Sequence, residues 1–188
     1  MTTPDQTMQV EAASGRPIEI KVREIGRLFH ALDPLPFRER DLDSAVEEYV
    51  VGWARELPTT QPIEIVVHLP REEAERKEAG EIAGAIHNYF AYRSQATRNE
   101  LRELFRVGRA SVLIGVAVLA ISVVVAGFAE TLAGEGRLGR FLHESLLIFG
   151  WVANWRPIQI FLYDWWPLAR RRALYDRLAR AEVRLVSL

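Results

Sequence analysis

The residues most able to do chemistry in this sequence are polar side chains that interrupt an apolar segment. Residues 141–166 are rich in Leu, Ile, Phe and Trp, yet they contain an arginine, Arg156. A charge removed from water needs a partner, because its desolvation is otherwise uncompensated. We therefore expect a polar cluster around this arginine, and its candidate members are Glu144, Asn154, Arg156, Gln159, Tyr163 and Asp164.

The partner of Arg156 is not determined by spacing alone. Gln159 and Tyr163 lie nearest to its face on a helix, whereas Glu144 is reachable only from a neighbouring subunit or across a broken helix. Pro157 favours a break, because it removes a backbone donor and leaves a carbonyl that Arg156 or the asparagine before it can satisfy. Two interpretations stay open: a structural arginine that neutralises these groups, or part of a path for an ion, lipid or substrate.

Histidines and nucleophiles form no recognisable catalytic or metal-binding arrangement. His143 stands beside Glu144 but lacks the second histidine of a zinc-peptidase helix, and Ser145 has no evident partner base. The four histidines, His30, His68, His87 and His143, include no ligand pair at helical spacing. The chain also has no cysteine, and therefore no thiol nucleophile and no thiolate ligand. Because none of these arrangements is present, we expect no enzymatic activity, no metal and no cofactor.

Acidic residues are concentrated in residues 39–43 without forming a calcium loop. Glu39, Asp41 and Asp43 lack the glycine and the distal glutamate of an EF-hand. Ser44 and Glu47 have capping-box spacing, so this group is expected at a helix N-terminus. The net charge of −1 provides no field that would attract nucleic acid, and no nucleic-acid partner is expected.

Two apolar segments must position the polar cluster. Residues 110–129 carry no charge, and these 20 positions are about the length that a helix needs to cross a hydrocarbon core of about 30 Å. With residues 141–166 as a second span, we expect an integral membrane protein with a two-helix transmembrane hairpin. Arg156 then lies near the bilayer centre. The alternative is that the second segment is re-entrant.

Arginines at the two outer ends of these segments indicate the orientation of the hairpin. The connection 131–140 holds fewer basic residues, so the positive-inside rule places it outside and both termini in the cytoplasm. These arginines should also contact the headgroups of anionic lipids. The expected headgroup residues are Arg98, Arg102, Arg106, Arg170, Arg171 and Arg172.

Small residues share a narrow arc of the first span. Ser111, Gly115, Ser122 and Ala126 lie on this arc, and small side chains let another helix approach closely. This packing face meets either the second span of the same chain or another subunit of a homo-oligomer.

The remaining chain predicts a small cytosolic αβ domain. Residues 17–22 alternate as a half-buried strand, and residues 63–68 are expected to form a second strand. Helices are expected from Ile25 to Leu32, from Arg38 to Leu57 and from Arg71. On the second helix, Leu42, Val46, Tyr49, Val50, Trp53 and Leu57 are expected to form the buried stripe. Since two strands rarely make a stable sheet, residues 183–186 are expected to add a third.

The expected organisation follows the chain in six parts. These are a disordered tail 1–16, the αβ domain with its membrane-proximal helix 17–98, the first span 99–130, an external loop 131–140, the second span 141–167, and a cytosolic helix and strand 168–188.

Two stretches resemble an uncharacterised bacterial family of two-span inner-membrane proteins. They are DPLPFRERDLDSAVEEYVVGWARELP at 33–58 and GWVANWRPIQIFLYDWWPLARRR at 150–172. The resemblance implies a bacterial inner membrane and no assigned reaction. The sequence therefore predicts a membrane-anchored scaffold or regulatory protein with an unknown protein partner. The alternative is an oligomeric channel or transport component whose second span lines a path.

Overall fold

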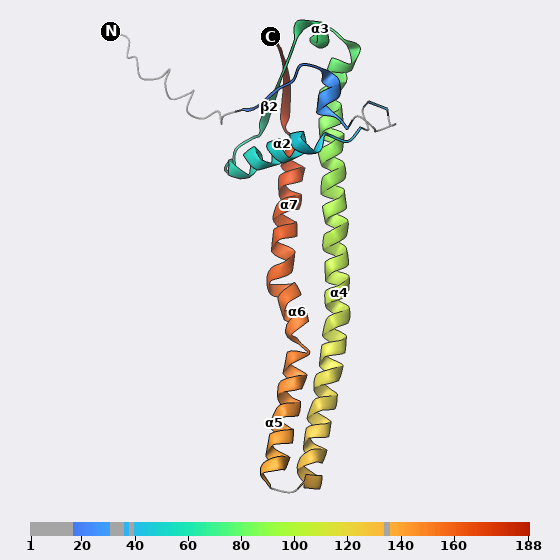
Figure 1. Ribbon diagram of the computed structural model, residues 1–188, viewed down its shortest axis with the longest axis vertical. Coiled ribbons are helices and arrows are strands. Elements are labelled where there is room, and N and C mark those ends of the chain that lie inside the picture. The colour runs from blue at the N-terminus through green and yellow to red at the C-terminus, as the bar shows by residue number, and fades with distance from the viewer. Residues whose placement is uncertain (1–16, 31–35, 38–39, 134–135) are drawn as a thin grey trace, which may run out of the picture. The chain divides into compact units, whose positions relative to one another are not determined.

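The computed structural model describes residues 17–30, 36–37, 40–133 and 136–188, and the predicted tail 1–16 lies outside them. Most of the described chain is helical, with one small sheet (Figure 1). The elements are β1 (Ile18–Lys21), α2 (Ser44–Glu56), β2 (Glu64–Leu69), α3 (Arg71–Ala74), α4 (Ile82–Ala133), α5 (Arg137–Val152), α6 (Trp155–Gln159), α7 (Trp165–Leu178) and β3 (Glu182–Ser187). They fall into two compact units, residues 1–96 with 171–188 and residues 97–170. We call them the αβ domain and the helical hairpin.

The sheet of the αβ domain has three parallel strands with β2 in the middle. Ile65 of β2 aligns with Ile18 of β1 and with Val183 of β3. The third strand expected from the sequence is therefore confirmed. Because the strands are parallel, each connection is a crossover, with α2 between β1 and β2 and the long helices between β2 and β3.

The core of the αβ domain lies between one face of the sheet and three helices. Ile65, Val67 and Leu69 of β2 alternate toward this face and are fully buried. Residues from α2, the start of α4 and the end of α7 pack against them, among them Val50, Ala54, Ile86, Phe90, Tyr175 and Leu178. The rings of Phe90 and Tyr175 stack with their centroids 6.1 Å apart.

The structure corrects the expected helix before α2. The predicted helix from Ile25 is only a 3-10 turn, Ile25–Leu28. Phe29 has extended backbone and forms a β-bridge with Leu42. The predicted end of this helix, Leu32, lies outside the described residues.

The start and the buried face of α2 also differ from the expectation. Asp43, not Ser44, caps the helix, and its carboxylate accepts a hydrogen bond from the N–H of Ala45. The buried side chains are Val50, Val51 and Ala54, whereas Tyr49 and Trp53 are 45% and 44% exposed. The inward face of α2 also carries Glu47, whose polar partners lie inside the domain.

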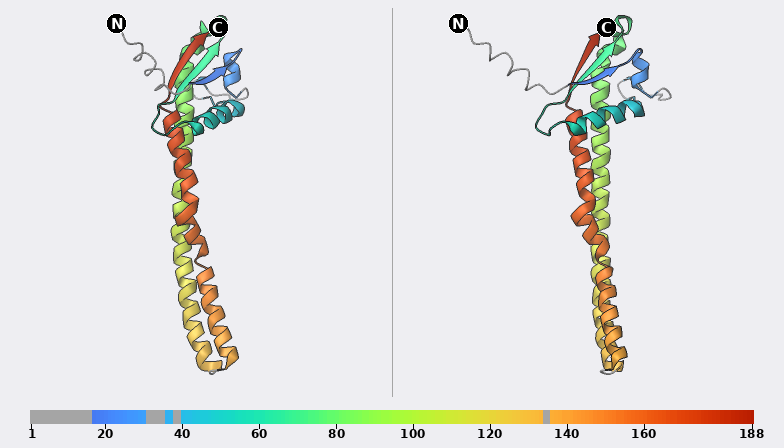
Figure 2. Two further views of the ribbon diagram at one scale, coloured as in Figure 1. Left: turned by 90° about the vertical axis from the view of Figure 1, so that its left-hand side faces the viewer. Right: turned by 60° about the vertical axis from the view of Figure 1, so that its left-hand side comes forward.

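Within the helical hairpin, α4 and α5 lie side by side in both views of Figure 2. Helix α4 ends at Ala133 and α5 begins at Arg137, inside the range 131–140 expected as a loop. One helix among the described residues is long and apolar enough to cross a membrane, and only 17% of its most apolar stretch is buried. The second segment is not one continuous helix, because α5 ends at Val152 and a π-helical turn, Ile160–Asp164, joins α6 to α7.

Candidate functional site

Small residues of α4 line the contact with the second helical segment of the hairpin. Gly108, Gly115 and Ser122 recur every seven residues, the period that keeps one helix face on its neighbour. A Cβ at Gly108 would lie 2.9 Å from Ile160 Cγ2, and one at Gly115 would lie 2.6 Å from Asn154 Oδ1. Larger side chains at these two positions therefore require the facing side chains or the helices to shift. Gly108 was missed by the sequence analysis, although its spacing from Gly115 was a usable signal.

The predicted packing residues lie on this contact face. Gly115, Ser122 and Ala126 are buried and Ser111 is half-buried. On the opposite helix, a Cβ added at Gly150 would lie 3.1 Å from Ser122 Cβ. Packing within the chain accounts for these contacts without a second subunit.

Asn154 replaces a backbone hydrogen bond where the second segment breaks. Its Nδ2 donates to the Gly150 carbonyl at 3.0 Å and to the Gly115 carbonyl at 3.1 Å. The first bond supplies the donor that Gly150 lacks, because the Asn154 N–H bonds to the Trp151 carbonyl instead. The second bond connects the break to α4. Both amide hydrogens of this side chain are thus used inside the hairpin.

Arg156 pairs with Asp164, with 2.9 Å between Nη1 and Oδ2. On a regular α-helix, residues eight apart are offset by about 80°. The π-helical turn Ile160–Asp164 is wider than an α-helical turn, so it brings Asp164 back toward the face of Arg156.

The other members of the predicted polar cluster do not join this pair. Gln159 and Tyr163 were expected to be nearest, but neither hydrogen-bonds to Arg156 within the described chain, and Tyr163 is 68% exposed. Glu144 is exposed on α5. The structure therefore brings together one ion pair and, separately, an asparagine bound to backbone carbonyls.

The packing contacts show where Arg156 lies along the uncharged run of α4. Asn154 lies level with Gly115, and Ile160 lies level with Gly108, so Arg156 is beside the beginning of the uncharged run 110–129. The middle of that run lies level with Gly150, whose Cβ would lie 2.8 Å from Leu119 Cδ1. Arg156 follows Gly150 by six residues, so at helical rise it lies about 9 Å from the middle of the uncharged run. It lies on the side of Arg106 and Arg109. Its partner Asp164 lies further along the chain, toward Arg170.

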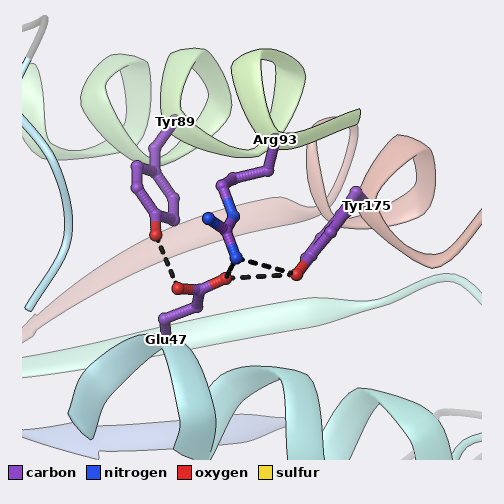
Figure 3. Close-up of polar contacts among 4 residues, drawn as sticks. All are labelled: Glu47, Tyr89, Arg93 and Tyr175. Carbon is purple, nitrogen blue, oxygen red and sulfur yellow. Dashed lines mark hydrogen bonds and ion pairs between the residues drawn. The ribbon is translucent and has the colours of Figure 1, made fainter. Parts of the chain in front are cut away.

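The αβ domain contains a polar cluster that the sequence analysis missed: Glu47, Tyr89, Arg93 and Tyr175 (Figure 3). Glu47 accepts hydrogen bonds from Tyr89 at 2.7 Å and from Tyr175 at 3.2 Å. Its Oε1 lies 2.9 Å from Arg93 Nη2, which also donates to the Tyr175 hydroxyl at 3.3 Å. We call these four residues the Glu47 cluster. The available signal was that Glu47 precedes the buried Val50 by three residues, on the same helix face.

The environment of the Glu47 cluster favours a neutral tyrosine and a charged arginine. Burial, followed by the hydrogen bond to Glu47 and its negative charge, raises the pKa of Tyr89 above its ordinary value. Burial alone would lower the pKa of Arg93, but the hydrogen bond to Tyr175 and the charge of Glu47 outweigh it, so that pKa is raised. The carboxylate of Glu47 already has three partners. Its contacts join α2 to α4 and α7, which is a structural role.

The predicted headgroup arginines differ in their partners. Arg106 pairs with Glu103 at 2.7 Å, Arg172 lies 3.7 Å from Asp176, and the Arg170 guanidinium is 6.0 Å from the centre of the Trp166 ring. The three others, Arg98, Arg102 and Arg171, are exposed.

Within the described residues, no group of three His, Asp or Glu side chains is arranged to hold a metal ion. His87 Nε2 lies 2.8 Å from the carbonyl of Ala181, and His143 Nδ1 lies 3.3 Å from that of Ala126. These histidines contact backbone rather than one another.

Comparison with known proteins leaves the family resemblance as a prediction. No family model, no curated protein and no solved structure matches this chain.

Proposed function

We propose that the protein is a membrane-anchored scaffold or regulatory protein, whose helical hairpin crosses a bacterial inner membrane twice and holds the αβ domain in the cytoplasm. The exposure of large apolar side chains on the hairpin carries this proposal. On α4, Leu113, Ile121 and Phe128 are 74%, 63% and 64% exposed. Soluble monomers rarely expose continuous apolar surface of this extent, whereas lipid stabilises it.

The second helical segment supports a full crossing over a re-entrant turn. Phe141, Phe149 and Trp155 are 65%, 63% and 63% exposed, so apolar side chains also point outward along this segment. Its contacts with α4 extend from Ala126, beside His143, to Gly108, beside Ile160. This length corresponds to most of the uncharged run of α4.

A channel or transport component is the second candidate, and the exposure of the Arg156 and Asp164 side chains, 58% and 35%, is the observation in its favour. Such a pair would line a path only where several copies assemble. We favour the scaffold because Asp164 neutralises Arg156 and because the side-chain amide of Asn154 donates both of its hydrogens to backbone carbonyls.

Removing both charges together distinguishes the two candidates. For a scaffold, the double variant Arg156→Leu with Asp164→Leu keeps its stability in detergent, since replacing an ion pair by apolar side chains is often neutral. For a path, the fold survives and ion flux through reconstituted vesicles changes.

A single lysine substitution on α4 tests the membrane assignment. Ile121→Lys should cost about 2.5–3.5 kcal/mol of insertion free energy and release part of the chain during alkaline extraction of membranes. The control is Tyr92→Lys on the same helix within the αβ domain, where the native side chain is 66% exposed. If residue 121 faced water, both lysines would change stability by about 0.5 kcal/mol or less. Equal extraction of the two variants would therefore contradict the proposal.

A further inference from the structure

β3 is an edge strand of the described sheet, and its ladder to β2 shows which backbone groups are used. The N–H of Glu182 donates to the Ile63 carbonyl at 3.0 Å, and the N–H of Leu188 donates to the Leu69 carbonyl at 2.8 Å. Backbone groups alternate in direction along a strand. The even-numbered residues of β3 therefore face β2.

The odd-numbered residues of β3 point away from β2. Val183, Leu185 and Ser187 direct their N–H and C=O groups outward, and no strand of the described chain lies beyond them. Figure 2 shows β3 at the border of the sheet. Such a row of backbone groups is a template for a further strand.

The side chains of β3 indicate an incomplete core at this edge. Leu185 aligns with Val67 of β2, which is fully buried on the helix-covered face, yet Leu185 itself is 38% exposed. Its neighbour Val186, on the opposite face, is 40% exposed. An additional strand beside β3 would cover both.

We propose that β3 pairs antiparallel with β3 of a second copy of this chain, about a two-fold axis through Leu185. The two sheets then join into one sheet of six strands. In this register Leu185 lies opposite its own counterpart, and Val183 lies opposite Ser187. Every outward N–H and C=O of the three residues gains a partner, and the two leucines cover each other. This pairing goes beyond the proposed membrane role and does not depend on it.

The charges of β3 favour this self-pairing. Arg184 falls opposite Val186, and Glu182 falls opposite Leu188, so no like charges face each other. An axis one residue earlier would place two arginines directly opposite, which is unfavourable. Arg184 is already held in its own chain by Glu182 at 2.8 Å and by Glu64 at 3.2 Å. Pairing therefore leaves no charge without a partner.

A charge exchange at the axis tests the proposal with the full chain in detergent. The wild type should be dimeric by light scattering. Leu185→Lys and Leu185→Glu should each weaken self-association by about tenfold or more, because each places like charges across the axis. An equal mixture of the two variants should recover the dimer, which a general loss of folding would not allow. A monomeric wild type, dimers in either variant alone, or a mixture that stays monomeric would overturn the proposal.

Cross-linking provides a second measurement with a smaller substitution. The chain has no cysteine, so Leu185→Cys introduces one thiol at the axis, where hydrogen-bonded antiparallel residues have Cα atoms about 5.5 Å apart, within disulfide range. Mild oxidation should give a covalent dimer. Lys21→Cys on β1, at the other edge of the sheet, should not. No dimer from Leu185→Cys, or equal dimer from both variants, would contradict the pairing.

Discussion

The hydroxyl of Tyr89 on α4 donates a 2.7 Å hydrogen bond to Glu47 Oε2 on α2. The other carboxylate oxygen of Glu47 binds Arg93 and Tyr175, so one acidic side chain joins three helices that are far apart in the sequence. Glu47 therefore shares the inward face of α2 with Val50 and Ala54, whereas Tyr49 is half-exposed.

We expect Glu47→Gln to destabilise the αβ domain by about 1–2 kcal/mol. The substitution removes a charge-assisted interaction with Arg93, which is worth about 1.5–3 kcal/mol when shielded and less here, because Arg93 is 41% exposed. Thermal unfolding of the full chain in detergent measures the effect. Glu48→Gln, at an exposed position one residue along, is the control and should change stability by about 0.5 kcal/mol or less. Equal effects from the two variants would remove the structural role assigned to Glu47.

Tyr89 should make stability depend on pH in the alkaline range. Its pKa is raised in the folded state by burial and by the hydrogen bond to Glu47, so the folded state holds its proton more tightly than the unfolded state. The resulting stabilisation is complete below the unfolded pKa of about 10 and is lost as the pH rises through the folded value. The unfolding free energy of the wild type should therefore fall above about pH 10 relative to Tyr89→Phe. A constant difference between the two proteins from pH 8 to 11 contradicts this.

Gly115→Ala should weaken the helical hairpin by about 1–3 kcal/mol, because the new methyl group meets the Asn154 amide oxygen. Gly127→Ala on the same helix is the matched control, since a Cβ there meets nothing within 4 Å. Unfolding in mixed detergent micelles measures both. Equal changes in unfolding free energy from the two substitutions would contradict the close approach of the two helices at Gly115.

Arg98 and Arg102 should hold the protein to anionic lipid more strongly than Arg106 does. Each exposed arginine near an anionic surface contributes about 1 kcal/mol, whereas Glu103 already neutralises Arg106. Flotation with vesicles containing phosphatidylglycerol should therefore show a larger loss for Arg98→Gln or Arg102→Gln than for Arg106→Gln. Equal retention of all three variants at low salt would exclude a headgroup role for these arginines.

Elements with a regular period could be predicted from the sequence. Alternation predicted β1, and residues 63–68 were correctly predicted as the second strand. The composition of 183–186, together with the need for a third strand, predicted β3. Asp43 was recognised as a residue suited to a helix N-terminus, and it caps α2.

The errors arose where a polar side chain or an irregular turn overrides the period. Glu47 occupies the buried face of α2, so a search for apolar residues alone placed Tyr49 and Trp53 in the core. Asp164 was among the expected partners of Arg156, but Gln159 and Tyr163 were expected to be nearer. A spacing of eight residues brings side chains together only across the wider π-helical turn that ends at Asp164. Such a turn has no signature in the order of apolar and polar residues.

The location of single introduced cysteines tests the membrane hairpin most directly. The chain has no native cysteine, so Ser14→Cys, Gly136→Cys and Ser187→Cys each report one position to a membrane-impermeant maleimide applied to intact spheroplasts. A hairpin with both termini in the cytoplasm predicts labelling of Gly136→Cys alone, and labelling of all three variants after the membrane is permeabilised. Labelling of Ser187→Cys or Ser14→Cys in intact spheroplasts, or protection of Gly136→Cys, would contradict the two-span hairpin and its cytoplasmic αβ domain.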